Sequence, residues 1–233
     1  MKKNNPALND SLKPDIFREL TNEQFNEFIG KGVLKTLTPK HILFHQGDSA
    51  NMCYFIKQGR LKLTQVNEDG KEIIFRYAGF QELIAAITVI KESKYPVTAE
   101  VIEKSEVIGW DKPTFTSLLE KFPRVAIKIL TIVIERLDDI QSRYMELCTE
   151  QVEQRIARTL LRFIRTTGTK TSEGICIDTP LTRQDLAEYM GTTLFSVSRT
   201  LSNWEKNGWI KTERGKLTVI HPHELVSLTE KEG

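Results

Sequence analysis

The stretch "LTRQDLAEYMGTTLFSVSRTLSNWEKNGWI", residues 181–210, contains two short amphipathic segments separated by a glycine. Thr182 suits the N-cap of a first helix, and Gly191 permits a sharp turn before a second helix, expected from about Leu194 to Asn207. One side of that second helix is apolar at helical spacing, with Val197, Leu201 and Trp204. The following "WIKTERGKLTVI" predicts a strand, a turn and a strand. The combination predicts a winged helix-turn-helix.

The segment before this unit has a second amphipathic pattern. Apolar residues fall on one face of an expected helix, and arginines fall largely on the other: Val152, Ile156, Leu160, Phe163 and Ile164, against Arg155, Arg158, Arg162 and Arg165. The run "TTGTKTSEG" then interrupts the periodicity. Between Glu153 and Lys216 there are eleven lysines and arginines and seven acids, whereas the whole chain has a net charge of only +2. Such a local excess is typical of a surface that binds a polyanion, although a solvated surface explains it equally well.

After Pro123 the sequence predicts a long helix with a heptad seam. Its apolar residues are spaced alternately by four and three positions: Ala126, Leu130, Val133, Leu137, Ile140, Tyr144 and Leu147. This regularity favours a parallel two-helix dimer contact, and packing of the helix on its own β domain is the alternative. Three more isoleucines lie off the seam, so the start of the helix is expected to touch both the partner and the β domain: Ile127, Ile129 and Ile132.

Residues 34–110 consist of short apolar runs rich in β-branched and aromatic residues: "HILF", "MCYFI", "LKLTQV", "EIIFRY", "VTAEVI" and "EVIGW". Glycines separate the runs. Asp69 and Gly70 in "NEDGKE" predict a tight hairpin turn in which both central residues have positive φ. Short strands at this spacing predict an antiparallel sandwich or barrel.

The composition limits the class of protein. With 233 residues, 39% of them hydrophobic, the chain can form one or two domains with a good core. No apolar run approaches the roughly 18 residues that a bilayer requires, and residues 1–10 lack the apolar core of a signal peptide. We therefore expect a cytoplasmic protein with no membrane partner. The three dispersed cysteines, Cys53, Cys148 and Cys176, argue against a disulfide framework and against a metal knuckle.

The chain resembles a known family through motifs that occur in the family's order: "FHQGD", "YFIKQGRLKL", "YPVTAEV", "RIARTLL" and "LTRQDLAEYMGTT…SVSRTL". These motifs are similar to those of the cyclic-AMP receptor protein and fumarate-nitrate-reduction regulator (CRP/FNR) family, over nearly the whole length. The resemblance implies an α+β chain with an N-terminal antiparallel β-roll like a cyclic-nucleotide-binding domain (residues 1–121). A long dimerisation helix (122–149) and a C-terminal winged helix-turn-helix domain (150–233) follow. It also implies a homodimeric transcription regulator that binds a palindromic operator in double-stranded DNA, under control of an effector, and contacts RNA polymerase.

The resemblance also implies which residues face DNA. Arg199 matches the family's base-reading arginine, and a guanidinium can donate two parallel hydrogen bonds to a guanine. Others match positions that face DNA in relatives and suit phosphate contacts: Thr182, Arg183, Gln184, Thr193, Ser196 and Ser198. Phe195 stands where many relatives have a glutamate that reads cytosine, and it could touch a thymine methyl instead. The operator is therefore expected to differ from the standard family sequence.

The sensory half departs further from the family pattern. The Gly-Glu pair that holds the ribose of a cyclic nucleotide aligns with Ala85 and Ala86, and the Arg-Ser pair that holds its phosphate aligns with Val97 and Thr98. Because a buried phosphate without a cation is costly to desolvate, cyclic AMP is a poor effector candidate. An apolar or uncharged-ring ligand fits better, near residues of the β domain and the helix: Ile84, Ala86, Val97, Thr98, Ile140 and Gln141.

The cofactor is unknown from sequence. An iron-sulfur cluster requires four thiolates, and the chain has three dispersed cysteines, so this cofactor is not expected. Haem remains a candidate because His41, His45 and Cys53 are close in sequence, although ordinary strand and loop roles explain these residues better. His221 and His223 have no partners at metal spacing, so no metal site is expected.

The sequence bears on two further classes of function. The chain has no P-loop, nucleophile elbow, HExxH motif or convincing carboxylate pair, so it is not expected to be an enzyme. The main alternative to a DNA-binding regulator is a dimeric sensor module that regulates a partner protein without binding DNA. Arg199 and the local basic excess favour DNA, and a salt-dependent shift of duplex DNA would separate the two classes.

Overall fold

The computed structural model describes residues 13–177, 182–213 and 216–230. Its internal contacts divide the chain into two compact units, Met1–Arg136 and Leu137–Gly233. The boundary lies inside the long helix α4 (Pro123–Thr149), which confirms the helix expected after Pro123. None of the helices in the described part of the chain combines the length and the apolar character that a membrane span requires.

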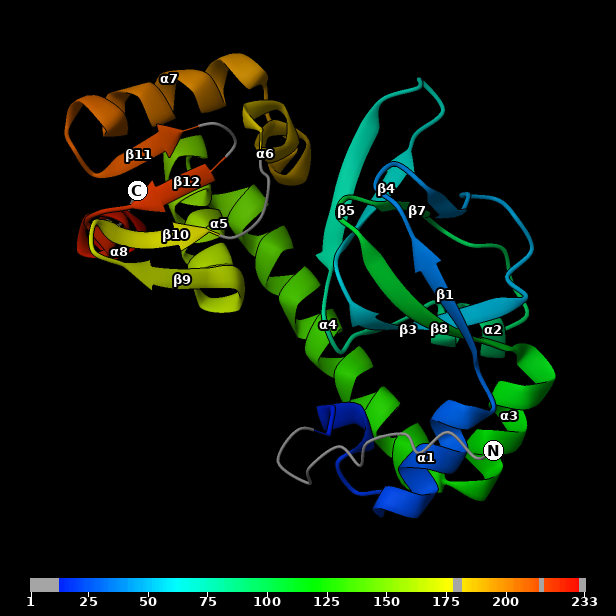
Figure 1. The fold of residues 1–233 in the computed structure, drawn as a ribbon. Helices are drawn as coiled ribbons and strands as arrows, with labels where there is room; N and C mark the ends of the chain where they lie inside the picture. Colours follow the sequence, from blue (N-terminus) through cyan, green and yellow to red (C-terminus); the bar gives the residue numbers. More distant parts are fainter. Residues whose placement is uncertain (1–12, 178–181, 214–215, 231–233) are drawn as a thin grey trace. The chain divides into compact units, whose positions relative to one another are not determined.

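The first unit contains two four-stranded antiparallel sheets (Figure 1). One has the strand order β1 (Val33–Leu37), β8 (Ser105–Asp111), β3 (Met52–Gln58) and β6 (Leu83–Ile84). The other has the order β2 (Ile42–Phe44), β7 (Thr98–Val101), β4 (Leu61–Val66) and β5 (Glu72–Ala78). Alternating apolar residues of both sheets are buried, because each sheet turns one face to a shared core. The predicted antiparallel β-roll is therefore confirmed.

The hairpin between β4 and β5 forms where the sequence predicts it, but its turn differs from the expectation. Val66 pairs with Glu72, so five residues connect the strands instead of two. Gly70 has a φ of 77°, whereas Asp69 is not among the residues with positive φ. Asn67 organises the loop: its carbonyl accepts from the Gly70 amide at 3.0 Å, and its side-chain oxygen accepts from the Lys71 amide at 2.8 Å. The hydrogen bonds of Asn67 therefore stabilise this longer loop, and a two-residue turn with two positive φ angles is not formed.

Four helical segments of the first unit were not predicted from the sequence: η2 (Asp15–Phe17), α1 (Asn22–Gly30), α2 (Ala86–Ile90) and α3 (Lys112–Lys121). The aromatic residues of η2, α1 and α3 join the hydrophobic core of the first unit. Phe28 is fully buried against Trp110, with ring centroids 5.4 Å apart, and the Trp110 indole Nε1 donates to the Phe28 carbonyl at 3.1 Å. This contact closes the end of the β-roll at α1 and satisfies the polar group of a buried tryptophan.

The apolar residues of α4 divide between two faces, and the division differs from the predicted seam. Val125 and Ile129 are buried in the core of the first unit, and Ile132 and Val133 pack against that core. The outward residues are 46% to 64% exposed: Ile127, Leu130, Ile134, Leu137, Ile140, Tyr144 and Leu147. Val133 therefore belongs to the inner face, and Ile127 and Ile134 belong to the outward stripe. The predicted seam included Val133 and omitted Ile127 and Ile134, so it was wrong at these positions, because packing on the β-roll decides which apolar residues of α4 are covered.

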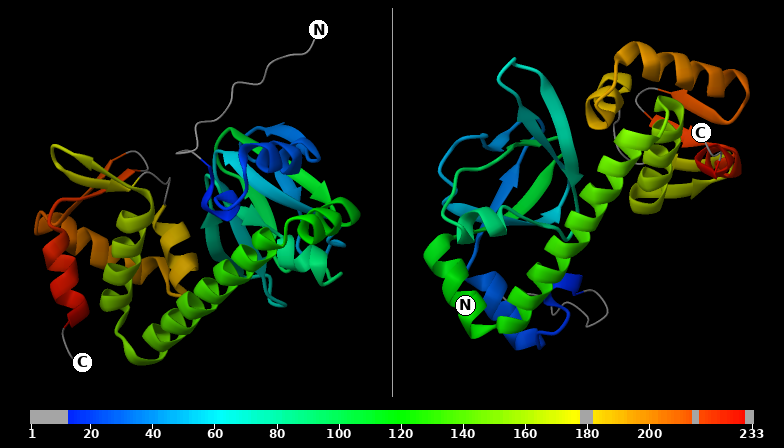
Figure 2. Two further views of the ribbon diagram at one scale, coloured as in Figure 1. Left: turned by 90° about the horizontal axis from the view of Figure 1, so that it is seen from below. Right: turned by 180° about the vertical axis from the view of Figure 1, so that it is seen from behind.

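The second unit combines helices with a four-stranded sheet of order β11 (Ile210–Glu213), β12 (Lys216–Val219), β10 (Gly174–Ile177) and β9 (Gly168–Thr171). Helix α5 (Val152–Thr167) buries Ile156, Leu160 and Phe163, as its periodicity predicts, and contacts α8 (Pro222–Glu230) beside it (Figure 2). The strands after "NGW" confirm the predicted wing. The run "TTGTKTSEG", expected only to interrupt the helix, forms a hairpin that extends the wing sheet.

Candidate nucleic-acid interface and ligand pocket

The helix-turn-helix forms from the stretch residues 181–210, with α6 (Arg183–Met190) and α7 (Leu194–Lys206). Leu181 lies outside the described residues. Thr182 caps α6 in a capping box with Asp185, whose side chain in turn accepts from the Thr182 amide at 2.9 Å. Gly191 ends α6 in the left-handed region, with a φ of 61°. Thr193 caps α7: its Oγ1 accepts from the Ser196 amide at 3.1 Å. Capping therefore already uses several hydroxyls that were expected to face DNA.

Arg183, which the sequence analysis assigns to a DNA phosphate, joins α6 to α7 in the structure. Its guanidinium donates to the Ser198 carbonyl at 3.3 Å, to Ser202 Oγ at 3.0 Å and to Glu205 Oε2 at 3.0 Å. Gln184 donates to Glu188 within α6 at 2.7 Å. The contacts of Arg183 tie the start of α6 to α7, so Arg183 helps to position α7.

Phe195 and Arg199 lie on the outward side of α7. Phe195 is 74% exposed, and Arg199, one turn later, is also exposed. Within the described residues, Arg199 makes no hydrogen bond or ion pair. The opposite side of α7 is buried at Val197, Leu201 and Trp204, as predicted, and the Trp204 indole donates to Glu153 on α5 at 3.0 Å. Burial of one side of α7 thus leaves Phe195 and Arg199 free to meet a ligand.

An open polar groove of about 630 Å³ runs beside α7. It is lined by the start of α5 and by one side of α7: Gln151, Val152, Glu153, Phe195, Ser196, Arg199, Thr200, Ser202, Asn203 and Lys206. Arg199 and Lys206 give this side of α7 two positive charges. The groove and the outward residues form a surface suited to a polyanion.

A second cavity, of about 130 Å³, lies in the first unit between α2 and the early turns of α4. Most of its lining residues have apolar side chains, although polar atoms make up about half of its exposed wall, and Arg136 is its cation. The lining residues are Ile16, Leu83, Ala85, Ala86, Ile87, Thr88, Ile129, Ile132, Val133 and Arg136. Among the residues expected at the effector, only Ala86 lines this cavity. Ile84 and Val97 are buried in the core, and Thr98 Oγ1 accepts from the Gln46 amide at 3.0 Å. Ile140 and Gln141 belong to the second unit.

Arg76, Glu82 and Arg136 form a charged cluster that the sequence did not reveal. Arg76 Nη1 lies 2.5 Å from Glu82 Oε2, and Arg136 Nη2 lies 3.5 Å from the same oxygen. Partial burial, and then the charge of Arg76, lower the pKa of Arg136 to about 10, against the opposing effect of Glu82. One carboxylate thus faces two guanidiniums, and an anion would relieve the imbalance. No motif marks this cluster, because its members come from β5, from the segment before β6 and from α4.

Comparison with known proteins finds two known domains in the chain. Residues 34–122 match the cyclic nucleotide-binding domain family, and residues 154–228 match the Crp-like helix-turn-helix domain family. The chain belongs to the CRP/FNR family of transcription regulators. The two matched domains carry the assignment, because they occur together and in the family's order.

Relatives of this regulator cover most of its length. It is 26% identical to the anaerobic regulatory protein of Bacillus subtilis (strain 168) over 223 residues, which are 95% of this chain and 90% of that protein. It is 22% identical to the CRP-like cAMP-activated global transcriptional regulator of Mycobacterium tuberculosis (strain H37Rv), over 80% of this chain and 83% of that protein.

Solved structures share the fold. The c-di-GMP responsive global regulator CLP of Xanthomonas campestris has a TM-score of 0.75 at 19% identity, covering 85% of this chain and 99% of that one. FixK2 of Bradyrhizobium japonicum has a TM-score of 0.74 at 17% identity, covering 87% of this chain and 99% of that one. The predicted family and fold are therefore confirmed.

The haem candidates in this regulator, Cys53, His41 and His45, lie in different environments. Cys53 is fully buried, and burial raises the pKa of its thiol strongly, so it stays protonated and is a poor ligand. His41 and His45 are exposed. Within the described ranges, no group of three histidines, cysteines or carboxylates is placed to hold a metal ion. These side chains do not fit a shared haem ligand set.

Ala85, at the start of α2, has a φ of 62°, in the left-handed region that favours glycine. It aligns with the glycine of the family's ribose-binding pair, and its backbone has a conformation that glycine adopts more readily than alanine. Ala85→Gly is expected to raise the free energy of unfolding by about 0.5–1 kcal/mol, since glycine adopts this φ without a Cβ clash. Denaturant unfolding measures the change. Ala99→Gly, in the buried strand β7, is the control that should lower stability; an unchanged or lower midpoint for Ala85→Gly would contradict the strain.

Proposed function

We propose that this regulator binds double-stranded DNA as a homodimer, with α7 of each subunit in the major groove of one half-site. The observation that carries the proposal is the outward pair Phe195 and Arg199 on a helix whose other side is buried. Arg199 donates two hydrogen bonds to O6 and N7 of a guanine. The hydroxyls of Ser198 and of the α7 cap lie at the same surface and suit phosphate contacts. The outward stripe of α4 forms the dimer contact.

Phe195 makes the proposed operator unusual. Its ring is 74% exposed at the first turn of α7 and can accept no hydrogen bond from a cytosine amine. An exposed phenyl group of this kind contacts a thymine methyl in the major groove. We therefore propose a half-site with a thymine at this position and a guanine opposite Arg199.

Selection from a random-sequence duplex pool tests DNA binding directly. The full-length protein should enrich a palindromic sequence, and its affinity for that sequence should fall steeply as salt rises, because phosphate contacts release counterions. If no sequence is enriched and duplex DNA is not shifted at low salt, the proposal fails. The alternative, a module that regulates a protein partner without DNA, would give that result.

We also propose that a small-molecule effector other than cyclic AMP controls the regulator from the first unit. Val97 is buried and apolar where the pattern has a phosphate-binding arginine, and Ala86 replaces the ribose-binding glutamate. The cavity beside α2 is lined mainly by residues with apolar side chains, and Arg136 is among the lining residues. Arg136 shares Glu82 with Arg76, so its charge is already partly balanced. A compact ligand with an apolar or uncharged ring fits this lining better than a cyclic nucleotide, because Val97 stands where the phosphate-binding arginine would be.

Cyclic AMP is accordingly expected to give no saturable heat in calorimetry and to leave DNA affinity unchanged at millimolar concentration. A cyclic phosphate keeps its negative charge, and its desolvation beside Val97 has no compensating cation. The control is a titration of the same preparation with operator DNA, which shows that the protein is active. A micromolar isotherm accompanied by tighter DNA binding would overturn this proposal.

The remaining parts of the proposed function follow from this assignment. Residues 1–121 form the sensory domain, 122–149 the dimerisation helix and 150–233 the DNA-binding domain. The regulator acts in the cytoplasm on genomic DNA, contacts RNA polymerase when bound upstream of a promoter and catalyses no reaction. Its relatives with curated functions are transcriptional regulators, which supports a binding role.

A further inference from the structure

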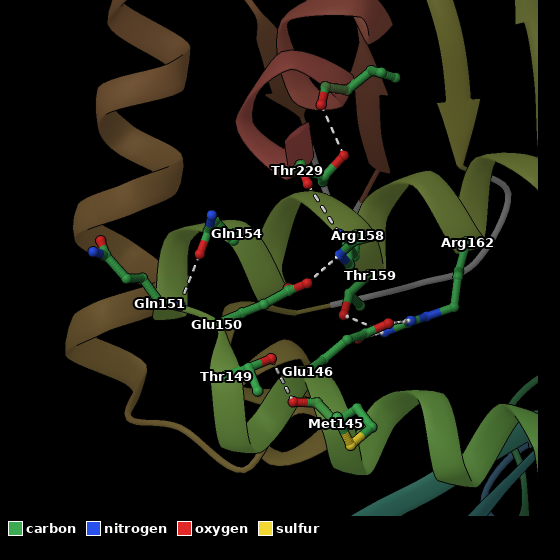
Figure 3. A network of polar contacts seen from close by, with 11 residues as sticks. Met145, Glu146, Thr149, Glu150, Gln151, Gln154, Arg158, Thr159, Arg162 and Thr229 are labelled. Carbon is green, nitrogen blue, oxygen red and sulfur yellow. Dashed lines mark hydrogen bonds and ion pairs between the residues drawn. The ribbon is translucent and has the colours of Figure 1, made fainter. Parts of the chain in front are cut away.

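Two arginines of α5 bind the end of α4. Arg162 Nη1 lies 2.6 Å from Glu146 Oε1, and Arg162 Nη2 lies 3.0 Å from Glu146 Oε2 (Figure 3). Both side chains are largely buried, with exposed fractions of 22% and 13%. Burial lowers the pKa of Arg162, but the hydrogen bonds and the charge of Glu146, together with weaker contributions from nearby groups, outweigh it, so the pKa is raised overall. A pair with two parallel hydrogen bonds fixes orientation as well as distance, so α5 has little freedom to rotate against α4.

The second arginine makes a three-way contact at the corner between the helices. Arg158 Nε donates to Glu150 Oε1 at 2.6 Å, and Arg158 Nη2 donates to the Thr229 carbonyl of α8 at 3.0 Å (Figure 3). Glu150 follows the last residue of α4, and Gln151 caps α5 directly after it. Glu150, at the corner, is thus bound by Arg158 of α5, and the same arginine also binds α8.

A third contact joins α4 to the helix-turn-helix itself. The Arg143 guanidinium lies 4.2 Å from the centroid of the Tyr189 ring of α6, and Arg143 Nη2 donates to the Tyr189 carbonyl at 3.0 Å. Tyr189 also packs on Phe163 of α5, with ring centroids 5.3 Å apart. The last turns of α4 therefore belong to the same compact unit as α6 and α7.

The same turns of α4 carry outward seam residues: Leu137, Ile140, Tyr144 and Leu147. One compact unit then holds both these proposed dimer-contact residues and the recognition helix. We propose that Glu146 and Glu150, through Arg162 and Arg158, are positioning residues that set the separation of the two recognition helices, so that the dimer reads a single half-site spacing. This inference rests on the proposed function, because it requires a dimer that binds DNA.

The physical basis is the geometry of the duplex. Half-sites one helical turn apart are separated by about 34–36 Å, and one base pair more or less moves them by about 3.4 Å and also rotates them. A dimer with rigid corners cannot follow that displacement without losing contacts in one half-site. A dimer with loosened corners can follow it, at the cost of less order in the preferred complex.

The test compares spacing preference in the wild type and in Glu146→Gln, which keeps the shape of the side chain and removes its charge. Operators selected by the wild type are rebuilt with one or two base pairs inserted or removed between half-sites, and affinity is measured by fluorescence anisotropy. The wild type should lose at least tenfold in affinity at one base pair from the preferred spacing. Glu146→Gln should lose less than threefold. Glu135→Gln, on an exposed face of α4, should behave as the wild type does.

Each outcome bears on the inference. Retention of the tenfold preference by Glu146→Gln, or absence of a preference in the wild type, would overturn it. Failure of the wild type to select any DNA would instead overturn the proposed function, and so the two are distinguished. Arg158→Lys supplies a second variant if Glu146→Gln is poorly folded by circular dichroism, because one ammonium cannot replace the fork that meets both Glu150 and Thr229. The dimer mass of every variant should match that of the wild type.

Discussion

Leu137→Glu is expected to convert the regulator from a dimer into monomers. Leu137 is 52% exposed at the middle of the outward stripe of α4, where the twofold axis of a parallel helix pair brings it opposite its own copy. Two glutamates there would be desolvated without cations, which costs about 3 kcal/mol or more and raises the dissociation constant at least about a hundredfold. Ile140→Glu should act in the same way. Light scattering at micromolar concentration measures the mass.

A matched variant separates the stripe from the helix as a whole. Ser142→Glu adds the same charge at an exposed position outside the stripe of α4, and it should leave the dimer intact. If Leu137→Glu and Ile140→Glu both retain the dimer mass while remaining folded, the outward stripe is not the dimer contact. The proposed mode of DNA binding would then have to be revised.

Arg199→Ala should abolish most of the preference for one guanine in each half-site. The lost bidentate contact corresponds to about 1–3 kcal/mol of discrimination, or roughly 5-fold to 150-fold in relative affinity. Arg183→Ala should behave differently, because Arg183 contacts Ser198, Ser202 and Glu205 of α7 and not an outward surface. This substitution should leave the position of α7 less well fixed, and it should therefore lower the affinity for all operators by about the same factor.

Competition binding with operators that carry each base at the guanine position measures this difference. Arg165→Ala, which removes an exposed arginine of α5, is the charge-matched control and should leave the order of preference unchanged. If Arg199→Ala retained the full preference for guanine, Arg199 would not be the base-reading residue. If Arg183→Ala changed the preferred base, Arg183 would contact DNA and its observed contacts would have to open on binding.

The differences between prediction and structure have common physical origins. The sequence marks an apolar heptad on α4, but Val133 and Ile134 are both apolar neighbours, and only the position of the β-roll decides which of them is covered. In the same way, Arg183 has the residue type expected at a phosphate. The proximity of Glu205 and Ser202 on the next helix, which no local pattern reports, directs it inward.

What the sequence determined by itself is local or periodic: the strands of the β-roll, the long helix, the capped helix pair around Gly191, and the buried side of α7 with Trp204. These follow from side-chain spacing, from caps and from backbone preferences of single residues, all of which act over a few positions. The tertiary structure alone decided which polar side chains meet. Two examples are the pairs Arg136–Glu82 and Arg162–Glu146, whose members come from segments that approach only in the folded chain. The local sequence around a charged residue does not identify its partner, because the partner is fixed only when folding buries the two side chains together.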